Sequence, residues 1–270
     1  MEIPSPLSFL RVGWRHRRLI LRLARRKIET RYRGSMLGSL WTLLQPLLML
    51  AVYTFVFGTV FQSRWQLEGS AQTPFALVLF AGMIFYSVFA ECVTEAPTLM
   101  TSNQTYIKQV LFPIEVLPWV SLAAALFGFA VNMALLLAFL VALVGLPPWS
   151  ALAAPLLLVP LLLLTLGASW MLSAAGVFLR DLAQIAGIFT TTLLFLSPIF
   201  YPAERIPEAF RPLYSVNPFV PMIEDFRAAL FEGRVPDGRT LLLLTALGWA
   251  AAWLGSLGFT STKKGFADVL

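Results

Sequence analysis

The sequence predicts an all-α, polytopic membrane protein with six transmembrane helices. Of its 270 residues, 58% are hydrophobic and only 13% are charged, whereas a soluble domain carries about 25% charged residues. The mean hydropathy is +0.77. A span needs roughly 20 mostly apolar residues, and such stretches recur along the chain, although the fifth is short and Pro155 and Pro160 interrupt the fourth. They occupy residues 37–61, 74–96, 116–145, 150–178, 184–201 and 240–260.

The distribution of basic residues predicts the orientation. Ten of the 20 Lys and Arg residues lie within the first 33 positions, directly before the first span. With that end in the cytoplasm, 14 basic residues fall on the cytoplasmic side and six on the other. Cytoplasmic loops carry an excess of Lys and Arg, so we expect both termini to be cytoplasmic. Anionic lipid headgroups attract such a segment, and the net charge of +6 therefore does not indicate nucleic-acid binding.

The N-terminal region predicts an amphipathic helix. Basic clusters alternate there with apolar residues at helical spacing, such as Leu10–Trp14 and Leu19–Leu23. A helix of this kind lies in the membrane interface. We therefore divide the chain into a cytoplasmic interfacial segment, residues 1–36, and a six-span transmembrane domain, residues 37–270. The segment serves either as a topology anchor alone or also as a docking surface for a cytoplasmic partner.

A polar insert between spans two and three is a second candidate docking surface. Pro97 and Pro113 flank it, and its middle has the composition of a short helix. Such a helix, parallel to the membrane on the cytoplasmic side, would contact a motor protein; the alternative is an ordinary connecting loop. The candidate residues are Thr101, Ser102, Asn103, Gln104, Thr105, Tyr106, Ile107, Lys108, Gln109 and Val110.

The segment between spans five and six combines prolines with aromatic residues. The prolines exclude one continuous helix, and the aromatic residues are too apolar for a free loop. We expect short re-entrant helices here, because irregular backbone at membrane depth must be buried in protein or line a cavity. Its rings could form an outer gate that stacks on sugars, or an aromatic belt at the interface. The candidate gate residues are Phe200, Tyr201, Phe210, Tyr214 and Phe219.

Catalytic and nucleotide-binding motifs are absent from the sequence. It contains no G-x-x-x-x-G-K-[ST] motif for ATP and none of the common hydrolase or dinucleotide motifs. One cysteine, Cys92, and one histidine, His16, do not make a metal site. Glu91 and Glu95 share a helix face near the cytoplasmic end of span two, as an interface feature or as a proton relay. Carboxylates this scattered disfavour a membrane-embedded transferase, so we predict a transporter that is not itself an enzyme.

Four segments resemble the permease subunits of type-2 ABC exporters that carry bacterial surface polysaccharides such as O-antigen, capsule and teichoic acid. The first is RKIETRYRGSMLGSLWTLLQPLLMLAVYTFVFGTVF, residues 26–61. The second is NQTYIKQVLFPIEVLP, residues 103–118. The third and fourth are GVFLRDLAQI, residues 176–185, and SPIFYP with NPF, within residues 197–219. Together they occur in the order of that family and extend over most of the chain.

This resemblance implies a homodimer in the bacterial inner membrane that exports a lipid-linked polysaccharide. Two copies of a separate subunit would bind ATP and Mg²⁺, and this chain would hold no cofactor. The polar insert would be the coupling helix, although Gln109 stands where the family often has a second basic residue. A type-2 ABC exporter of a lipid or small molecule is the alternative.

The basic density of the interfacial helix suggests a role in binding the substrate. Guanidinium groups match phosphate oxygens, so we hypothesise that arginines there attract the diphosphate of the lipid carrier. In the resembling family the same stretch also meets the ATPase. The candidate residues are Arg25, Arg26, Arg31 and Arg33.

Overall fold

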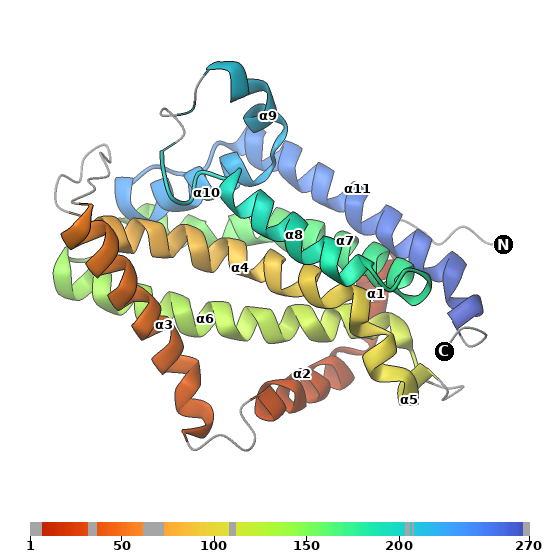
Figure 1. Cartoon of the computed structure of the whole chain (residues 1–270). Coiled ribbons are helices and arrows are strands. Elements are labelled where there is room, and N and C mark those ends of the chain that lie inside the picture. Colours follow the sequence, from red (N-terminus) through yellow and green to blue (C-terminus); the bar gives the residue numbers. More distant parts are fainter. Residues whose placement is uncertain are drawn as a thin grey trace.

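The computed structural model describes residues 7–31, 37–61, 73–107, 112–202, 206 and 208–266, and this part of the chain contains helices and no strand. The all-α prediction is confirmed. Figure 1 shows long helices stacked into one bundle, with α1 and the end of α11 toward the same end of it. The α-helices are α1 (Ser8–Arg15), α2 (Arg17–Arg31), α3 (Trp41–Tyr53), α4 (Phe75–Leu99), α5 (Gln104–Ile107), α6 (Leu117–Leu143), α7 (Leu158–Phe178), α8 (Leu182–Phe195), α9 (Arg211–Val216), α10 (Phe219–Arg227) and α11 (Gly238–Thr262).

Five helical segments in the described residues are long and apolar enough to cross a membrane, in agreement with a polytopic protein. They are Trp41–Val60, Phe75–Leu99, Ile114–Leu143, Trp149–Phe178 and Gly238–Thr262. The first includes the π-helix η2 (Thr54–Val60), and the fourth begins as the 3₁₀ helix η5 (Trp149–Leu157).

The fifth expected span, residues 184–201, is shorter than its apolar stretch. Helix α8 ends at Phe195, shortly before Pro198, which has no backbone N–H to donate. Its 14 residues extend about 21 Å, less than the roughly 30 Å of a bilayer core. The chain therefore leaves the helix before the apolar stretch ends.

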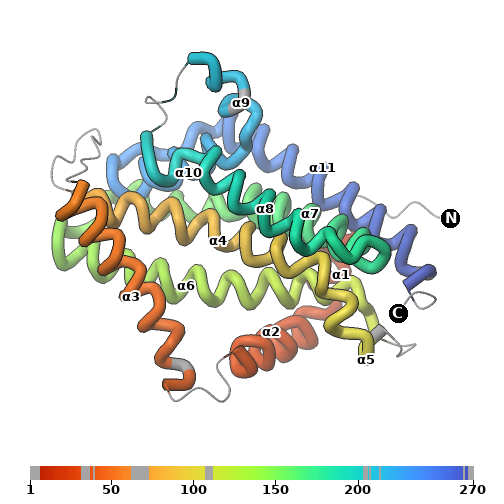
Figure 2. Tube along the Cα trace, viewed as in Figure 1, coloured from red at the N-terminus to blue at the C-terminus, as the bar shows by residue number. Residues whose placement is uncertain are grey.

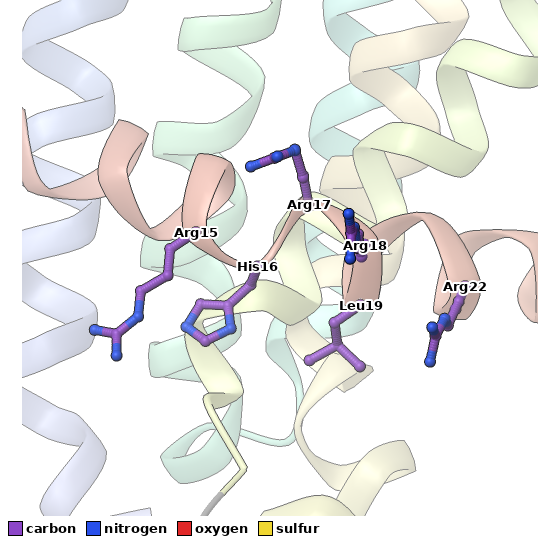
Figure 3. A pocket seen from close by; sticks show the side chains of 6 residues that line it. All are labelled: Arg15, His16, Arg17, Arg18, Leu19 and Arg22. Atoms are coloured by element: carbon purple, nitrogen blue, oxygen red, sulfur yellow. The ribbon is translucent and has the colours of Figure 1, made fainter.

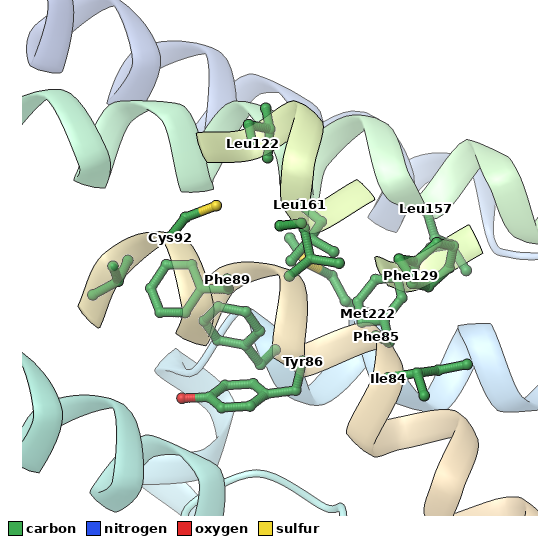
Figure 4. Close-up of a cluster of buried hydrophobic side chains, with 14 of the residues drawn as sticks. Ile84, Phe85, Tyr86, Phe89, Cys92, Leu122, Phe129, Leu157, Leu161 and Met222 are labelled. Carbon is green, nitrogen blue, oxygen red and sulfur yellow. The ribbon is translucent and has the colours of Figure 1, made fainter. Parts of the chain in front are cut away.

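Helix α4 is the centre of the bundle. It packs against α6, α7, α8 and α10, and most of its length is buried within the chain. Its side chains Phe85, Tyr86 and Phe89 interlock with Phe129 of α6 and Met222 of α10 (Figure 4). By contrast, α3 is almost uncovered, and Figure 2 shows it leaning away from the other helices toward one end.

Glycines let α7 and α11 approach backbone to backbone. A Cβ at Gly255 would lie 2.3 Å from the carbonyl oxygen of Gly167, and one at Gly167 would lie 2.4 Å from the backbone of Ala251. A Cβ at Gly248 would lie 2.8 Å from the carbonyl oxygen of Pro160. Small residues at such contacts favour association of helices in membranes, where van der Waals packing replaces the hydrophobic effect.

The N-terminal basic region forms two helices, with a break at His16. Helix α1 enters the bundle, where the ring of Phe9 lies 6.0 Å from Trp170 and 5.1 Å from Trp249, edge to face. Helix α2 lies along the start of α6, with Ile20 and Ala24 against Val116 and Val120. The expected amphipathic helix is therefore present as two pieces, and the first of them is anchored among the bundle helices.

The connection from α10 to α11 has a glycine and a carboxylate at its two turning points. The π-helix η8 (Ala228–Glu232) ends at Gly233 with φ +77°, a left-handed conformation that favours glycine. The backbone N–H of Thr240 donates to the carboxylate of Asp237 at 2.9 Å, which caps α11. Hydrogen bonds from Thr240 lower the pKa of this exposed carboxyl.

The glycine contact between α7 and α11 generates a prediction. Gly255→Ala should destabilise the protein by about 1–3 kcal/mol, because overpacking against backbone cannot be relieved by a rotamer change. Gly258→Ala on the same helix is the control, since its Cβ would meet no atom within 4 Å. Unfolding of the purified protein in detergent, followed by circular dichroism, measures both. Equal stabilities of the two variants would contradict the proposed contact.

Candidate functional site

Ion pairs fasten α2 to the bundle at the end where α11 finishes. We call this end, made of α2, α5, η9 (Lys263–Gly265) and the adjoining ends of α4 and α6, the basic end. Lys27 pairs with the carboxylate of Glu95 on α4, and its ammonium also donates to Ser121 Oγ at 3.0 Å. Arg31 pairs with Glu91. These contacts fix α2 against the ends of α4 and α6, both of which are distant from α2 in the sequence.

Glu91 and Glu95 are partners of α2 rather than isolated carboxylates in a membrane. Both side chains are one-third exposed, and both face the interfacial helix. A third carboxylate, Glu115 at the start of α6, pairs with Lys263 after α11. This arrangement supports the interpretation of these residues as interface features over a proton relay.

The described part of the predicted coupling segment is helical. It consists of η3 (Thr101–Asn103) and α5, whereas Lys108, Gln109 and Val110 lie outside the described residues. The Oγ of Ser102 donates to the carbonyl of Thr98 at 2.8 Å, and the Nδ2 of Asn103 donates to that of Leu99 at 2.9 Å. These bonds satisfy carbonyls that the end of α4 leaves free.

The coupling segment is also tied to α2. The hydroxyl of Tyr106 accepts a hydrogen bond from Arg26 Nη1 at 3.5 Å, and its ring stacks on Phe112 with centroids 4.6 Å apart. The side chains of Ser102, Gln104 and Thr105 are exposed. The structure thus brings two predicted surfaces, the interfacial helix and the polar insert, together at the basic end.

The predicted phosphate-binding arginines have partners within the chain. Arg25 pairs with Glu29 at 2.8 Å, and both side chains are largely exposed. Arg26 contacts Tyr106 and Arg31 pairs with Glu91. Arg33 lies outside the described residues. A phosphate group would have to compete with carboxylates for at least two of these guanidinium groups.

A buried arginine that the sequence did not single out lies between α8 and α4. The side chain of Arg227 is 3% exposed. Its Nε donates to the carbonyl of Val78 at 2.9 Å and its Nη2 to that of Ile199 at 2.8 Å, while Nη1 donates to the carbonyl of Pro198. Gly82 makes room for it, because a Cβ there would lie 2.3 Å from Nη2. The only signal in the sequence is one arginine within the apolar stretch FRAALF.

Helix α10 begins where α8 ends. The Nδ2 of Asn217 donates to the carbonyl of Leu196 at 3.1 Å, and its Oδ1 accepts from the backbone N–H of Phe219 at 3.0 Å. The ring of Phe219 then packs between Tyr86 and Phe89, at 5.3 Å and 4.6 Å, halfway along α4. The chain thus returns into the bundle at the depth where α8 stops.

The predicted gate aromatics do not form one cluster. Phe200 stacks on Phe195 at 5.3 Å, and the hydroxyls of Tyr201 and Tyr214 share a hydrogen bond. Phe219 is buried in the bundle, whereas Phe210 is exposed. Phe200, Tyr201 and Tyr214 therefore gather beyond the end of α8, whereas Phe219 lies inside the bundle.

Comparisons with known proteins agree with this architecture. A family model described as ABC-2 type transporter matches residues 18–231. The chain is 30% identical to an O-antigen export system permease protein RfbA of Myxococcus xanthus, over 97% of this chain and 99% of that protein. It is 27% identical to a protein of the same name from Klebsiella pneumoniae, over 93% and 95%. It is 23% identical to the polysialic acid transport protein KpsM of Escherichia coli, over 85% and 88%.

The half-buried Lys27–Glu95 pair between α2 and α4 should contribute more to the free energy of unfolding than the exposed Arg25–Glu29 pair on α2. A double-mutant cycle with Lys27→Met and Glu95→Gln should give a coupling energy of about 1–3 kcal/mol. The matched cycle with Arg25→Met and Glu29→Gln should give about 0.3–0.5 kcal/mol. Denaturant unfolding of the four variants of each cycle supplies the values. Coupling that is equal in the two cycles would show that the α2–α4 pair is not a fastening point.

Removing Arg227 should unfold the turn after α8. Arg227→Met leaves three carbonyls without their donor and should cost about 3 kcal/mol or more. Arg239→Met at the exposed start of α11 is the control and should change stability by less than about 0.5 kcal/mol. Thermal unfolding in detergent compares them, and proteolysis within residues 197–216 locates the damage. Wild-type stability of Arg227→Met would mean that these carbonyls find other donors.

Proposed function

Because the chain belongs to the ABC-2 type transporter family, we propose that it is the membrane-spanning subunit of an ATP-driven polysaccharide exporter. Its substrate would be O-antigen or a similar lipid-linked polymer, moved outward from the cytoplasmic side of the bacterial inner membrane. The observation that carries the proposal is similarity over nearly the whole chain to proteins named for O-antigen export and polysialic acid transport.

ATP hydrolysis belongs to a separate subunit in this proposal. The sequence has no P-loop, so ATP and Mg²⁺ would bind to the partner. The partner would dock on the basic end, where Ser102, Gln104 and Thr105 are exposed beside α2. The Tyr106–Arg26 contact and the α2–α4 ion pairs support this assignment, because they would pass a push on the coupling segment to the bundle.

The basic end would face the cytoplasm. It contains the N-terminal arginines and Lys263, and the positive-inside rule places such a concentration of basic residues on the cytoplasmic side. Both termini would then be cytoplasmic. The turn after α8 and the start of α11 would lie on the opposite side, with α10 as a re-entrant helix between them.

A second copy of the chain would cover α3. Large apolar side chains along this helix are exposed, among them Leu43, Leu48 and Val52, although α4 is mostly buried. Lipid alone could face such a helix, but a homodimer would enclose a path for a polymer that one bundle cannot enclose. The resemblance to type-2 ABC exporters, which implies a homodimer, supports this arrangement.

The substrate would enter along α2 and leave past the aromatic residues. Arg25, Arg26, Arg31 and Arg33 would attract the diphosphate of the lipid carrier in competition with Glu29 and Glu91. Of the predicted gate residues, Phe200, Tyr201, Phe210 and Tyr214 would form the exit, where rings offer stacking faces to sugars, and Phe219 would be a packing residue of the bundle beneath them. The grouping of three of these rings beyond α8 supports the assignment.

Docking of the ATPase is tested first with a bulky substitution on the coupling segment. Thr105→Trp should reduce co-purification of the ATPase at least tenfold, because the exposed threonine lies on the proposed contact surface. Ser215→Trp, on the exposed side of α9, is the control and should leave it unchanged. Retention of the ATPase by both variants, with both correctly folded, would remove the coupling segment from the interface.

The substrate class is tested in cells. Deletion of the chain should leave a lipid-linked polymer inside the cell and remove it from the surface, and the wild-type chain should restore it. Gel analysis of lysates and of intact cells after surface labelling separates the two pools. Unchanged surface polysaccharide, with loss of an exported lipid or small molecule, would contradict the proposed substrate.

A further inference from the structure

A second group of cations lies where α1 meets α2, apart from the arginines assigned to the polysaccharide carrier. The chain turns at His16, and the side chains around the turn enclose an open hollow of about 440 Å³. We call it the junction hollow. Figure 3 shows its lining from close by. The residues that line it are Arg15, His16, Arg17, Arg18, Leu19 and Arg22.

The cations of the junction hollow differ from those farther along α2. Arg25 and Arg31 each pair with a carboxylate, whereas in the described part of the chain Arg15, Arg18 and Arg22 make no ion pair. In Figure 3, Arg15, His16 and Arg22 extend to the same side of the ribbon. Within the described residues, three of the four guanidinium groups that line the hollow have no carboxylate to neutralise them, and such a cluster of cations suits an anion.

Apolar side chains beside the hollow indicate which anion. Trp14 is 73% exposed and Leu21 is 64% exposed. Arg17 is held on the first of these, because its Nη1 donates to the carbonyl of Trp14 at 3.1 Å and its guanidinium lies 4.8 Å from the ring centroid. An exposed tryptophan and leucine next to cations are typical of a helix that rests on a lipid surface. Binding of a small free anion would not involve these exposed apolar side chains.

We propose that the junction hollow binds the phosphate of an anionic phospholipid headgroup, with Trp14 and Leu21 inserted among the neighbouring acyl chains. Guanidinium forks match phosphate oxygens in geometry as well as charge. The bound lipid would hold the turn between α1 and α2 at the membrane surface. The proposal uses residues that the polysaccharide pathway does not use, so it stands or falls independently of the exported substrate.

The test measures binding of lipid to the purified full-length chain in a neutral detergent by native mass spectrometry. Dioleoyl phosphatidylglycerol should bind at least tenfold more tightly than dioleoyl phosphatidylcholine. Arg18→Gln/Arg22→Gln should weaken phosphatidylglycerol binding about 25-fold, since each basic side chain near an anionic surface contributes about fivefold. Arg180→Gln/Arg239→Gln, which removes two exposed charges elsewhere, should change it less than twofold.

Three results would overturn the proposal. They are equal binding of the two lipids, wild-type affinity in Arg18→Gln/Arg22→Gln, and displacement of phosphatidylglycerol by inorganic phosphate at a comparable concentration. The last would identify a site for free phosphate instead. If the glutamine variant fails to fold, as judged by gel filtration and thermal unfolding, Arg18→Lys/Arg22→Lys decides the question. This variant keeps both positive charges and loses the bidentate guanidinium groups. Its affinity for phosphatidylglycerol should therefore fall between the affinities of the wild-type chain for phosphatidylglycerol and for phosphatidylcholine.

Discussion

Every backbone carbonyl and N–H at membrane depth needs a partner, because lipid offers none. Long helices meet this requirement along most of the chain. It becomes a problem where α8 stops after 14 residues, and the protein solves it there with one buried arginine. Arg227 donates to two carbonyls of the turn after α8 and to one carbonyl of α4, and Asn217 joins the end of α8 to the start of α10. The short helices of this region can exist in the bundle only because these side chains replace the missing helical hydrogen bonds.

At the basic end, the partner of each basic side chain depends on its position along α2. In the second half of the helix, basic side chains pair with carboxylates of α4 and donate to Tyr106. These contacts join the helix to the bundle and to the coupling segment. The first half keeps its arginines around the junction hollow. One helix therefore connects three environments: the protein core, the proposed ATPase surface and the membrane surface.

Composition and the length of apolar runs were enough to predict an all-α membrane protein, since spanning helices are set by bilayer thickness rather than by tertiary packing. The meeting of the interfacial helix and the polar insert was predictable only in part. The distribution of charged and apolar residues placed both segments on the cytoplasmic side of the membrane. The pairing of Lys27 with Glu95, however, depends on how helices distant in sequence pack. The end of α8 at Phe195 was missed because apolar residues continue past it, and the break at His16 was missed because the alternation of basic and apolar residues continues on both sides of it. The role of Arg227 could not be predicted because its acceptors at Val78 and Ile199 are distant in sequence and are brought to it by the fold. Arg33 and residues 108–110 stay predictions.

The glycine contact of α7 and α11 has a mechanical meaning. Two helices whose backbones touch have no layer of side chains between them that could change rotamers and absorb a displacement. We expect α7 and α11 to move together as one rigid unit. The Lys263–Glu115 pair lies at one end of this unit. At the other end, the hydroxyl of Ser150 donates to the carbonyl of Ala229 at 2.7 Å. A movement of one of these helices at the basic end would therefore be expected to move the other with it, because little side-chain packing separates them.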